Sequence, residues 1–277
     1  MRPLVKRFVD TCTPNLGRLY RQFRDERRLS RPGLLTPLGV ILAADESIQR
    51  GEFEQDELQL FLEILAGSSV CVDVGAHIGL YSCLAAKRGK HAVAVEPLGS
   101  NLSLLYRNLV TNGFLDVEVY PVGLASKPGL RRLFGGGTGA SFVAGWAATP
   151  ERWSRTVPVT TLDIILGDRF TGIQLIIKVD VEGFELEVLR GAQQTLGMAP
   201  KPRWLVEICL GEYHPTGRNR EFEEVFEVFW RNGYVARTAD PTRRPISRED
   251  VKRWLHMGFV DFGSQNYLFV PSNDCDS

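Results

Sequence analysis

Glycine and acidic residues cluster at two places where a short apolar run ends, a pattern that can bind a ligand. The first cluster spans Asp73 to Gly79, so that a carboxylate stands beside a turn framed by Gly75 and Gly79. Glycine lets the backbone approach a ligand closely. The second cluster is Glu96-Pro97, where the next apolar run ends. Because the carboxyl ends of neighbouring parallel strands meet at one edge of a sheet, these groups are expected to share one site.

The spacing of the first cluster favours a cationic ligand over a pyrophosphate. A dinucleotide fingerprint reads G-x-G-x-x-G and cradles pyrophosphate with backbone N–H groups. This turn instead reads G-x-x-x-G after Asp73, and negative charge there favours a sulfonium or amino group. Glu96 can accept hydrogen bonds from both hydroxyls of a ribose, each worth roughly 1.5–3 kcal/mol. The pattern therefore predicts S-adenosylmethionine rather than a nicotinamide dinucleotide; a structural turn with a surface glutamate is the alternative.

A third group of polar residues follows the apolar run at 175–179. Asp180 is expected at the carboxyl end of a strand, Glu182 in the following turn, and Glu185 in the first turn of a helix, where an acid complements the helix dipole. Lys178 interrupts the apolar run, and burying its ammonium group is costly unless a carboxylate pairs with it. This segment is therefore expected to hold the residues that carry out the reaction.

Alternating strands and helices are expected to position these clusters. The expected strands are 70–74, 91–95, 117–122, 175–179 and 204–208, with further candidates at 234–236 and 266–270. Segments with helical spacing lie between these strands, and one of them is an expected helix at 184–196. Apolar strands separated by helices predict an α/β fold with an open, mostly parallel sheet and helices on both faces. The glycine-rich segment 125–156 is expected to be irregular and, with 237–262, to shape the substrate pocket.

The first 33 residues differ from the rest, and the boundaries expected are a basic helical extension at 1–33 and one domain at 34–277. Residues 1–31 hold nine basic and three acidic residues. Two short apolar stripes within them have helical spacing. The extension could pack on the domain or make peripheral contact with an anionic membrane, and the shortness of the stripes favours packing.

The overall composition argues against several classes of protein. Basic and acidic residues number 33 each, so no net positive charge points to nucleic acid as a partner. The five cysteines have neither disulfide-framework nor zinc-ligand spacing. We recognise neither a secretory signal nor an apolar stretch long enough to span a membrane in this sequence. These features predict a cytoplasmic protein that acts on a small molecule or glycan, and they leave its oligomeric state open.

The segment from Lys178 to Gly191, which reads KVDVEGFELEVLRG, resembles the signature of the FkbM-type methyltransferases. Further pieces that match in the same order are Asp73 to Gly79, Glu96-Pro97, Asn108 to Gly113, Leu162-Asp163, Glu207 and Asn266 to Pro271. The resemblance covers roughly residues 34–271. One departure is His77, where the family more often has Asn.

The resemblance implies a class I methyltransferase (Rossmann-like) fold, with a seven-stranded, mostly parallel sheet whose last strand is antiparallel. It also implies methyl transfer from S-adenosylmethionine, typically to a hydroxyl of a saccharide, glycolipid or polyketide-type metabolite. The residues expected to bind the donor are Asp73, Gly75, Ala76, His77, Gly79, Glu96 and Pro97. Those expected to face the substrate are Asp180, Glu182 and Glu207, with Lys178 beside them.

A base that accepts the proton of the acceptor hydroxyl would add roughly 10²–10⁴-fold to the rate. Asp180 is the first candidate, with Glu182 in the same catalytic group, and His214 is the second because imidazole titrates near neutral pH. His214 could instead have a surface or packing role, and Glu207 could instead pair with Lys178 across neighbouring strands. Asp180, Glu182 and Glu207 could also gather a divalent metal, but no ligand spacing requires one, so no metal site is predicted.

Two other functions remain open from the sequence. One is a nicotinamide-dependent oxidoreductase, against which the G-x-x-x-G turn argues. The other is a catalytically silent methyltransferase fold that serves as a binding or scaffold protein. The pair Asp73 and Glu96 favours real donor binding, and Asp180 favours catalysis.

Overall fold

The computed structural model describes residues 26–273 of the chain, beginning with a helical turn at 26–29. Most of the expected N-terminal extension, including both of its apolar stripes, lies outside the described residues. Within the described residues, no helix is long and apolar enough to cross a membrane.

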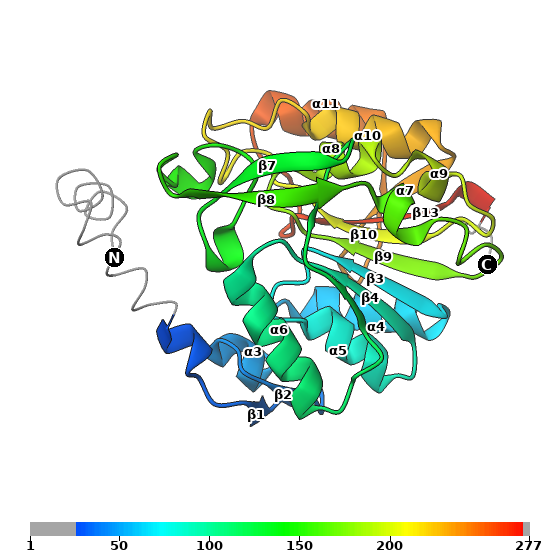
Figure 1. The fold of residues 1–277 in the computed structure, drawn as a ribbon. Helices are drawn as coiled ribbons and strands as arrows, with labels where there is room; N and C mark the ends of the chain where they lie inside the picture. The colour runs from blue at the N-terminus through cyan, green and yellow to red at the C-terminus, as the bar shows by residue number, and fades with distance from the viewer. Residues whose placement is uncertain (1–25, 274–277) are drawn as a thin grey trace.

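The central sheet of the described part contains eight strands: β3 (Val70–Val74), β4 (His91–Val95), β5 (Glu118–Tyr120), β9 (Leu175–Val179), β10 (Arg203–Glu207), β11 (Tyr234–Thr238), β12 (Pro245–Ile246) and β13 (Asn266–Pro271). Their order in the sheet is β12-β11-β13-β10-β9-β3-β4-β5 (Figure 1). The five strands from β5 to β10 are parallel, and β13 is antiparallel to both of its neighbours. This confirms the expected mostly parallel sheet with an antiparallel last strand. The short β12 pairs with β11 and adds an eighth strand at the edge.

The strand order reverses between β3 and β9, and this reversal positions the site. The chain builds the sheet outward from β3 through β4 to β5, then returns to place β9 on the other side of β3. Connections that leave neighbouring parallel strands toward opposite faces open a crevice at the carboxyl ends of those strands. The crevice of this sheet therefore lies beside Val74 and Val179, the paired last residues of β3 and β9.

Helices cover both faces of the sheet, as predicted (Figure 1). One face carries α4 (Gln55–Ala66), α5 (Leu80–Lys87) and α6 (Gly99–Thr111). The other carries α7 (Leu162–Leu166), α8 (Glu185–Arg190), α9 (Gln193–Leu196), α10 (Phe222–Arg231) and α11 (Arg248–Met257). Each layer has its own apolar core, so the strands between them are buried on both sides.

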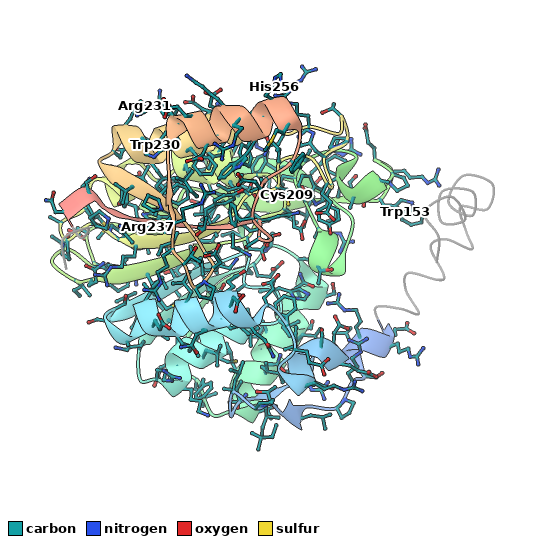
Figure 2. All side chains as sticks on the ribbon, turned by 180° about the vertical axis from the view of Figure 1, so that it is seen from behind. Trp153, Cys209, Trp230, Arg231, Arg237 and His256 are labelled. Carbon is teal, nitrogen blue, oxygen red and sulfur yellow. The ribbon has the colours of Figure 1, made fainter. Side chains whose placement is uncertain are left out.

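Helix α10 illustrates how sequence periodicity builds the second layer. Its residues Phe222, Val225, Phe226 and Phe229 recur at helical spacing and are all buried. Phe229 stacks on Phe269 of β13 with ring centroids 3.8 Å apart. In the view from behind, Cys209 and the aromatic core lie inside the molecule, whereas exposed residues such as His256 lie on the outer side of α11 (Figure 2).

The segment 125–156, expected to be irregular, is partly ordered into a second sheet. Three strands, β6 (Gly123–Leu124), β7 (Gly129–Phe134) and β8 (Ser154–Thr160), are arranged in the order β6-β8-β7. The sequence pattern of β7 did not predict a strand because both faces carry exposed residues: Gly129 on one face, and Leu130 and Arg132 on the other. Residues 135–153 between β7 and β8 remain irregular, with two short 3₁₀ turns.

One predicted helix needs correction, and two helices of the structure were not predicted. The expected helix at 184–196 is divided into α8 and α9 at Gly191, where a Cβ would lie 2.2 Å from the Ala125 carbonyl oxygen. The short α7 was not predicted. Neither was α11, which lies in the expected pocket segment 237–262 and begins with a capping box formed by Ser247 and Asp250. At the start of the domain, β1 (Leu34–Leu35), β2 (Ile41–Leu42) and α3 (Glu46–Arg50) form a hairpin and a helix.

Candidate functional site

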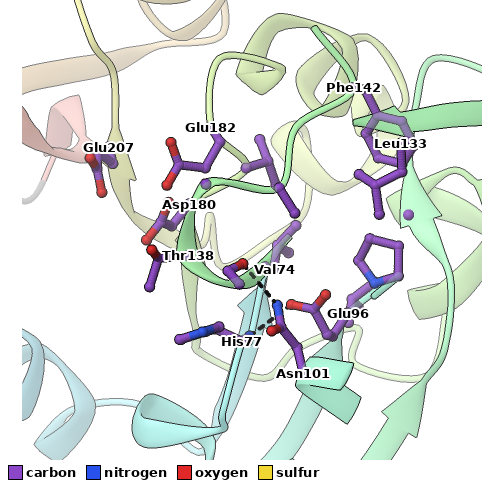
Figure 3. A pocket seen from close by; sticks show the side chains of 18 of the residues that line it. Val74, His77, Glu96, Asn101, Leu133, Thr138, Phe142, Asp180, Glu182 and Glu207 are labelled. Carbon is purple, nitrogen blue, oxygen red and sulfur yellow. Dashed lines mark hydrogen bonds between the residues drawn. The ribbon is translucent and has the colours of Figure 1, made fainter. Parts of the chain in front are cut away.

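A cavity of about 450 Å³ opens at the carboxyl ends of the central strands (Figure 3). Its lining comes from the ends of β3, β4, β9 and β10, from the loop before α4 and from the irregular segment between β7 and β8. A smaller cavity of about 100 Å³ adjoins it and shares Phe53, Glu54, Gly75, His77, Thr138 and Asp180 with it. Together the two volumes are in the range that encloses a small organic ligand.

Most of the residues singled out in the sequence meet at these cavities. The large cavity is lined by Gly75, His77, Glu96, Pro97, Asp180, Glu182 and Glu207. The small cavity adds Asp73, Ala76 and Lys178. Gly79 and His214 line neither cavity.

The turn after β3 requires a glycine because its backbone packs directly against the backbone of Asp180, which follows β9. Gly75 has φ +82°, and a Cβ on it would lie 1.8 Å from the Asp180 carbonyl oxygen. Asp73 accepts hydrogen bonds from the Ser82 backbone N–H at 3.0 Å and from its hydroxyl at 2.6 Å, which ties β3 to α5. Gly79 (φ +83°) is the N-cap of α5 and thus supports the turn from behind.

His77 occupies the left-handed region with φ +51°, a region in which Asn, Asp and His are enriched among non-glycine residues. Its ring Nε2 lies 2.8 Å from a guanidinium nitrogen of Arg28, which comes from the helical turn at 26–29. Burial and the charge of Arg28 lower the pKa of His77 to about 3, so the ring is neutral. The described end of the N-terminal extension therefore packs against the turn at the site.

Glu96 is held firmly at the end of β4. It is only 4% exposed, and its Oε2 accepts a hydrogen bond from the His77 backbone N–H at 2.9 Å while Oε1 accepts one from the Leu98 N–H at 2.7 Å. Burial raises its pKa to about 7, although these hydrogen bonds oppose the rise. The carboxyl group of Glu96 thus has a fixed orientation at the edge of the large cavity.

Carboxyl groups dominate the opposite wall of the cavity (Figure 3). Burial raises the pKa of Asp180, although the ammonium group of Lys178 opposes the rise. The charge of Asp180, followed by burial, raises the pKa of Glu207 well above its usual value. Burial raises the pKa of Glu182 and of Glu54 to about 8. At neutral pH these acids therefore share protons, and a cation entering the cavity would ionise them.

Glu182 is fixed from the side of the second sheet. Its backbone has φ +56°, and Trp146 donates a hydrogen bond from its indole Nε1 to Glu182 Oε2 at 2.6 Å. Ser141 donates from its hydroxyl to the Glu182 carbonyl oxygen at 2.6 Å. The irregular segment between β7 and β8 therefore positions an acid of the site.

Lys178 is 1% exposed, and its ion-pair partners are Glu57 at 3.1 Å and Asp180 at 3.9 Å, rather than Glu207. Glu57, from α4, also accepts a hydrogen bond from the Tyr81 hydroxyl at 2.5 Å. The sequence correctly required a buried carboxylate partner for Lys178, but it could not identify a residue 121 positions away on another element.

His214 lines neither cavity, and its ring packs edge-on against Trp146 with the centroids 6.1 Å apart. It is half-buried in the loop after β10, and its Nδ1 lies 2.9 Å from the Thr216 hydroxyl oxygen. Burial lowers its pKa. Its neighbour Tyr213 lines the large cavity instead.

Several lining residues escaped the sequence analysis: Phe53, Glu54, Asn101, Leu133, Thr138, Ala140, Phe142, Ala147 and Tyr213. Most belong to loops whose sequence carries no motif. Asn101 did carry a signal, because it stands in the first turn of the helix that follows Glu96-Pro97. In the described part of the chain, no group of three or more His, Cys, Asp or Glu residues is arranged to hold a metal ion.

Comparison with known proteins gives one clear match. A family model described as the Methyltransferase FkbM domain matches residues 73–236. No match was found among curated proteins. Similar solved structures include a SAM-dependent methyltransferase from Agrobacterium tumefaciens (TM-score 0.45, 9% identity, 88% of this chain and 71% of that chain covered). Another is the precorrin-6y C5,15-methyltransferase from Geobacter metallireducens GS-15 (TM-score 0.42, 12% identity, 87% and 97% covered).

The buried ion pair gives a prediction about stability. Lys178→Met leaves the Glu57 carboxylate buried without its cation and is expected to lower the free energy of unfolding by about 3–5 kcal/mol. Adding Glu57→Gln should recover part of this loss, since a neutral amide needs no counter-ion. Urea unfolding measures both variants, with Lys127→Met at an exposed position as the control. A double variant no more stable than Lys178→Met alone would contradict the assigned pairing.

The raised pKa values predict how stability depends on pH. The values of about 6 for Asp73, 7 for Glu96 and Glu185, and 8 for Glu54 and Glu182 all exceed the ordinary ones. The folded protein therefore binds more protons than the unfolded chain, and its stability must fall as pH rises from about 4.5 to 8. The melting temperature of the ligand-free protein should drop between pH 5.5 and 8.5.

The matched variants for this test are Glu182→Gln, which should reduce the slope, and Glu223→Gln on the outer part of α10, which should not. A melting temperature that stays level or rises over this range would be inconsistent with protonated carboxyl groups in the cavity.

Proposed function

The chain belongs to the FkbM methyltransferase family and uses S-adenosylmethionine, and we propose that it methylates a hydroxyl oxygen of a saccharide, glycolipid or related hydroxylated metabolite. The observation that carries the proposal is the position of Asp180. It directly follows β9, lines both cavities and stands beside Glu182 and Glu207.

The charge of the cavity wall fits the donor. Five of the lining residues are carboxylic acids (Glu54, Glu96, Asp180, Glu182 and Glu207), and within residues 26–273 no lysine or arginine lines this cavity. Negative charge attracts a sulfonium cation and repels a pyrophosphate. This supports S-adenosylmethionine as the ligand and argues against a nicotinamide dinucleotide.

The residues that line the cavity suit each part of the donor. Glu96, fixed by two backbone N–H groups, would accept hydrogen bonds from the ribose. Pro97, Leu133 and Phe142 supply apolar surface for the adenine. Gly75, with no side chain, leaves room for the backbone to meet the methionine portion. Asp73, which lines the small cavity, would support the turn through Ser82.

The bound donor supplies an electrophilic methyl group on a positively charged sulfur. The acceptor oxygen forms a bond to that methyl carbon as the carbon–sulfur bond breaks, and the electron pair of that bond stays on sulfur. Asp180 accepts the proton that the hydroxyl loses. Its raised pKa makes its carboxylate a stronger base than an exposed aspartate, and the Lys178 ammonium group at 3.9 Å favours the ionised form that can accept the proton.

The remaining residues would orient the acceptor. Carboxylates at Glu182 and Glu207 can accept hydrogen bonds from further hydroxyls of a saccharide, and the exposed ring of Tyr213 offers an apolar face at the rim. Alignment of the oxygen with the methyl carbon would contribute most of the rate, on the order of 7–11 kcal/mol of the barrier.

Replacing Asp180 tests the proposal. Asp180→Asn keeps the shape of the side chain but cannot accept the proton, so turnover should fall by about 10²–10⁴-fold. Transfer from methyl-labelled donor is measured on a panel of methyl glycosides of hexoses, 6-deoxyhexoses and hexosamines, with mass spectrometry to locate the methyl group. Affinity for S-adenosylhomocysteine, measured by calorimetry, should change little.

The control is His214→Gln, which should retain turnover because His214 lines neither cavity. Full activity of Asp180→Asn would eliminate it as the base. Label found only on the amines of the hexosamines would refute transfer to oxygen, and donor binding without transfer to any acceptor would favour a binding protein.

The same acids predict that the donor releases protons when it binds. A sulfonium cation beside carboxyl groups with raised pKa values favours their ionised forms, so protons leave at pH 7. Calorimetric enthalpies in phosphate and Tris buffers report the number released. S-adenosylhomocysteine, which has the same groups without the sulfonium charge, should release fewer. Equal release by both ligands would contradict the electrostatic assignment.

A further inference from the structure

Asn101 carries an unused hydrogen-bond acceptor inside the large cavity. It lies in the first turn of α6, is 2% exposed and lines the cavity next to Glu96 (Figure 3). Its Nδ2 donates a hydrogen bond to the Gly137 carbonyl oxygen at 3.3 Å. Its Oδ1 is buried and has no hydrogen-bond partner among the residues that the structure describes.

The orientation of the amide is fixed by its surroundings. Rotating it by 180° would bring Oδ1 against the carbonyl oxygen of Gly137, where two acceptors would face each other. Asn101 also lowers the pKa of the neighbouring Glu96 carboxyl group, as an amide that turns its N–H side toward that carboxyl group would. The orphaned atom is therefore an acceptor, and a ligand must supply an N–H or O–H group to satisfy it.

Glu96 alone is poorly placed to hold both hydroxyls of a ribose. Each of its carboxyl oxygens already accepts a backbone N–H, from His77 and from Leu98. A carboxylate oxygen has room for one further hydrogen bond, but the backbone donors restrict its direction. A vicinal diol brings two O–H donors to this place, and the free Oδ1 of Asn101 lies beside the carboxylate.

We propose that the diol is shared: Glu96 accepts a hydrogen bond from one ribose hydroxyl of the donor, and Asn101 Oδ1 accepts one from the other. The inference rests on the donor site described under the proposed function. Because Nδ2 of the same amide holds Gly137, Asn101 also links the ribose to the segment between β7 and β8, which covers the cavity.

The experiment compares three nucleosides in competition with S-adenosylhomocysteine: adenosine, 2′-deoxyadenosine and 3′-deoxyadenosine. The native protein should bind each deoxy analogue about five- to thirtyfold more weakly than adenosine, since each lacks one of the two hydrogen bonds. In Asn101→Ala, adenosine should weaken by a similar factor. One of the two deoxy analogues should then bind as well as adenosine, because the hydroxyl it lacks no longer has a partner.

A purely structural role would give a different result. If Asn101 only held Gly137, Asn101→Ala would weaken all three nucleosides equally, and both deoxy analogues would keep their native disadvantage. That outcome would overturn the inference. Asn101→Ser provides the same comparison if the alanine variant does not fold. Ser103→Ala, an exposed position on the same helix whose hydroxyl bonds only to the Gly99 carbonyl, is the matched control and should leave all affinities unchanged.

The failure of the inference can be told apart from failure of the donor site. Native protein that binds neither S-adenosylhomocysteine nor adenosine would overturn both. Suppose instead that the native protein binds both ligands, and that the affinities of the deoxy analogues relative to adenosine are unchanged in Asn101→Ala. This result would overturn only the sharing of the diol.

Discussion

Lys178 places an ammonium group inside the central sheet, level with Asp73 of β3 and Leu205 of β10, and the acids of the site depend on it. The desolvation of a lysine at 1% exposure is offset by the carboxylates of Glu57 and Asp180. In return, the ammonium favours the ionised form of Asp180 and so opposes the rise in its pKa that burial and the charge of Glu57 cause. A hydrophobic residue here, together with a neutral residue in place of Glu57, could build the sheet as well, so the lysine is better explained by the charge that it places beside Asp180.

The backbone is strained where it surrounds the cavity. Glu54, His77, Ala147 and Glu182 all have positive φ, and all of them line the large cavity. Such conformations cost on the order of 1–3 kcal/mol each and persist only where surrounding contacts enforce them. Here Trp146 holds Glu182, and Glu96 holds the backbone of His77. The strained residues thus meet at one site from four separate segments of the chain.

The fold and half of the site could be predicted because their signals are local. Each strand is a short apolar run, and Asp73, Glu96 and Asp180 come directly at or after the end of such a run, so the parallel topology brings them together. Glu57 could not be predicted, since nothing in α4 distinguishes it from other acids on a helix. The second sheet was missed because β7 carries exposed residues on both faces. His214 was chosen for its chemical type alone, and residue type does not determine position.

The number of charges in the site explains why so many acids with raised pKa values are useful to a methyltransferase. The donor brings one positive charge on sulfur, and the transfer removes that charge while releasing one proton from the acceptor. If Asp180 takes this proton, the cavity loses a negative charge at the moment when the ligand loses its positive one. The wall and its ligand therefore stay balanced on both sides of the reaction, which limits the electrostatic cost in a partly buried site. An exposed aspartate with an ordinary pKa would release the proton to water and leave an unpaired carboxylate against the neutral product. Asp180 stands at the cavity wall with Lys178 at 3.9 Å and has a raised pKa, so it can hold the proton, and this matches the charge change of methyl transfer.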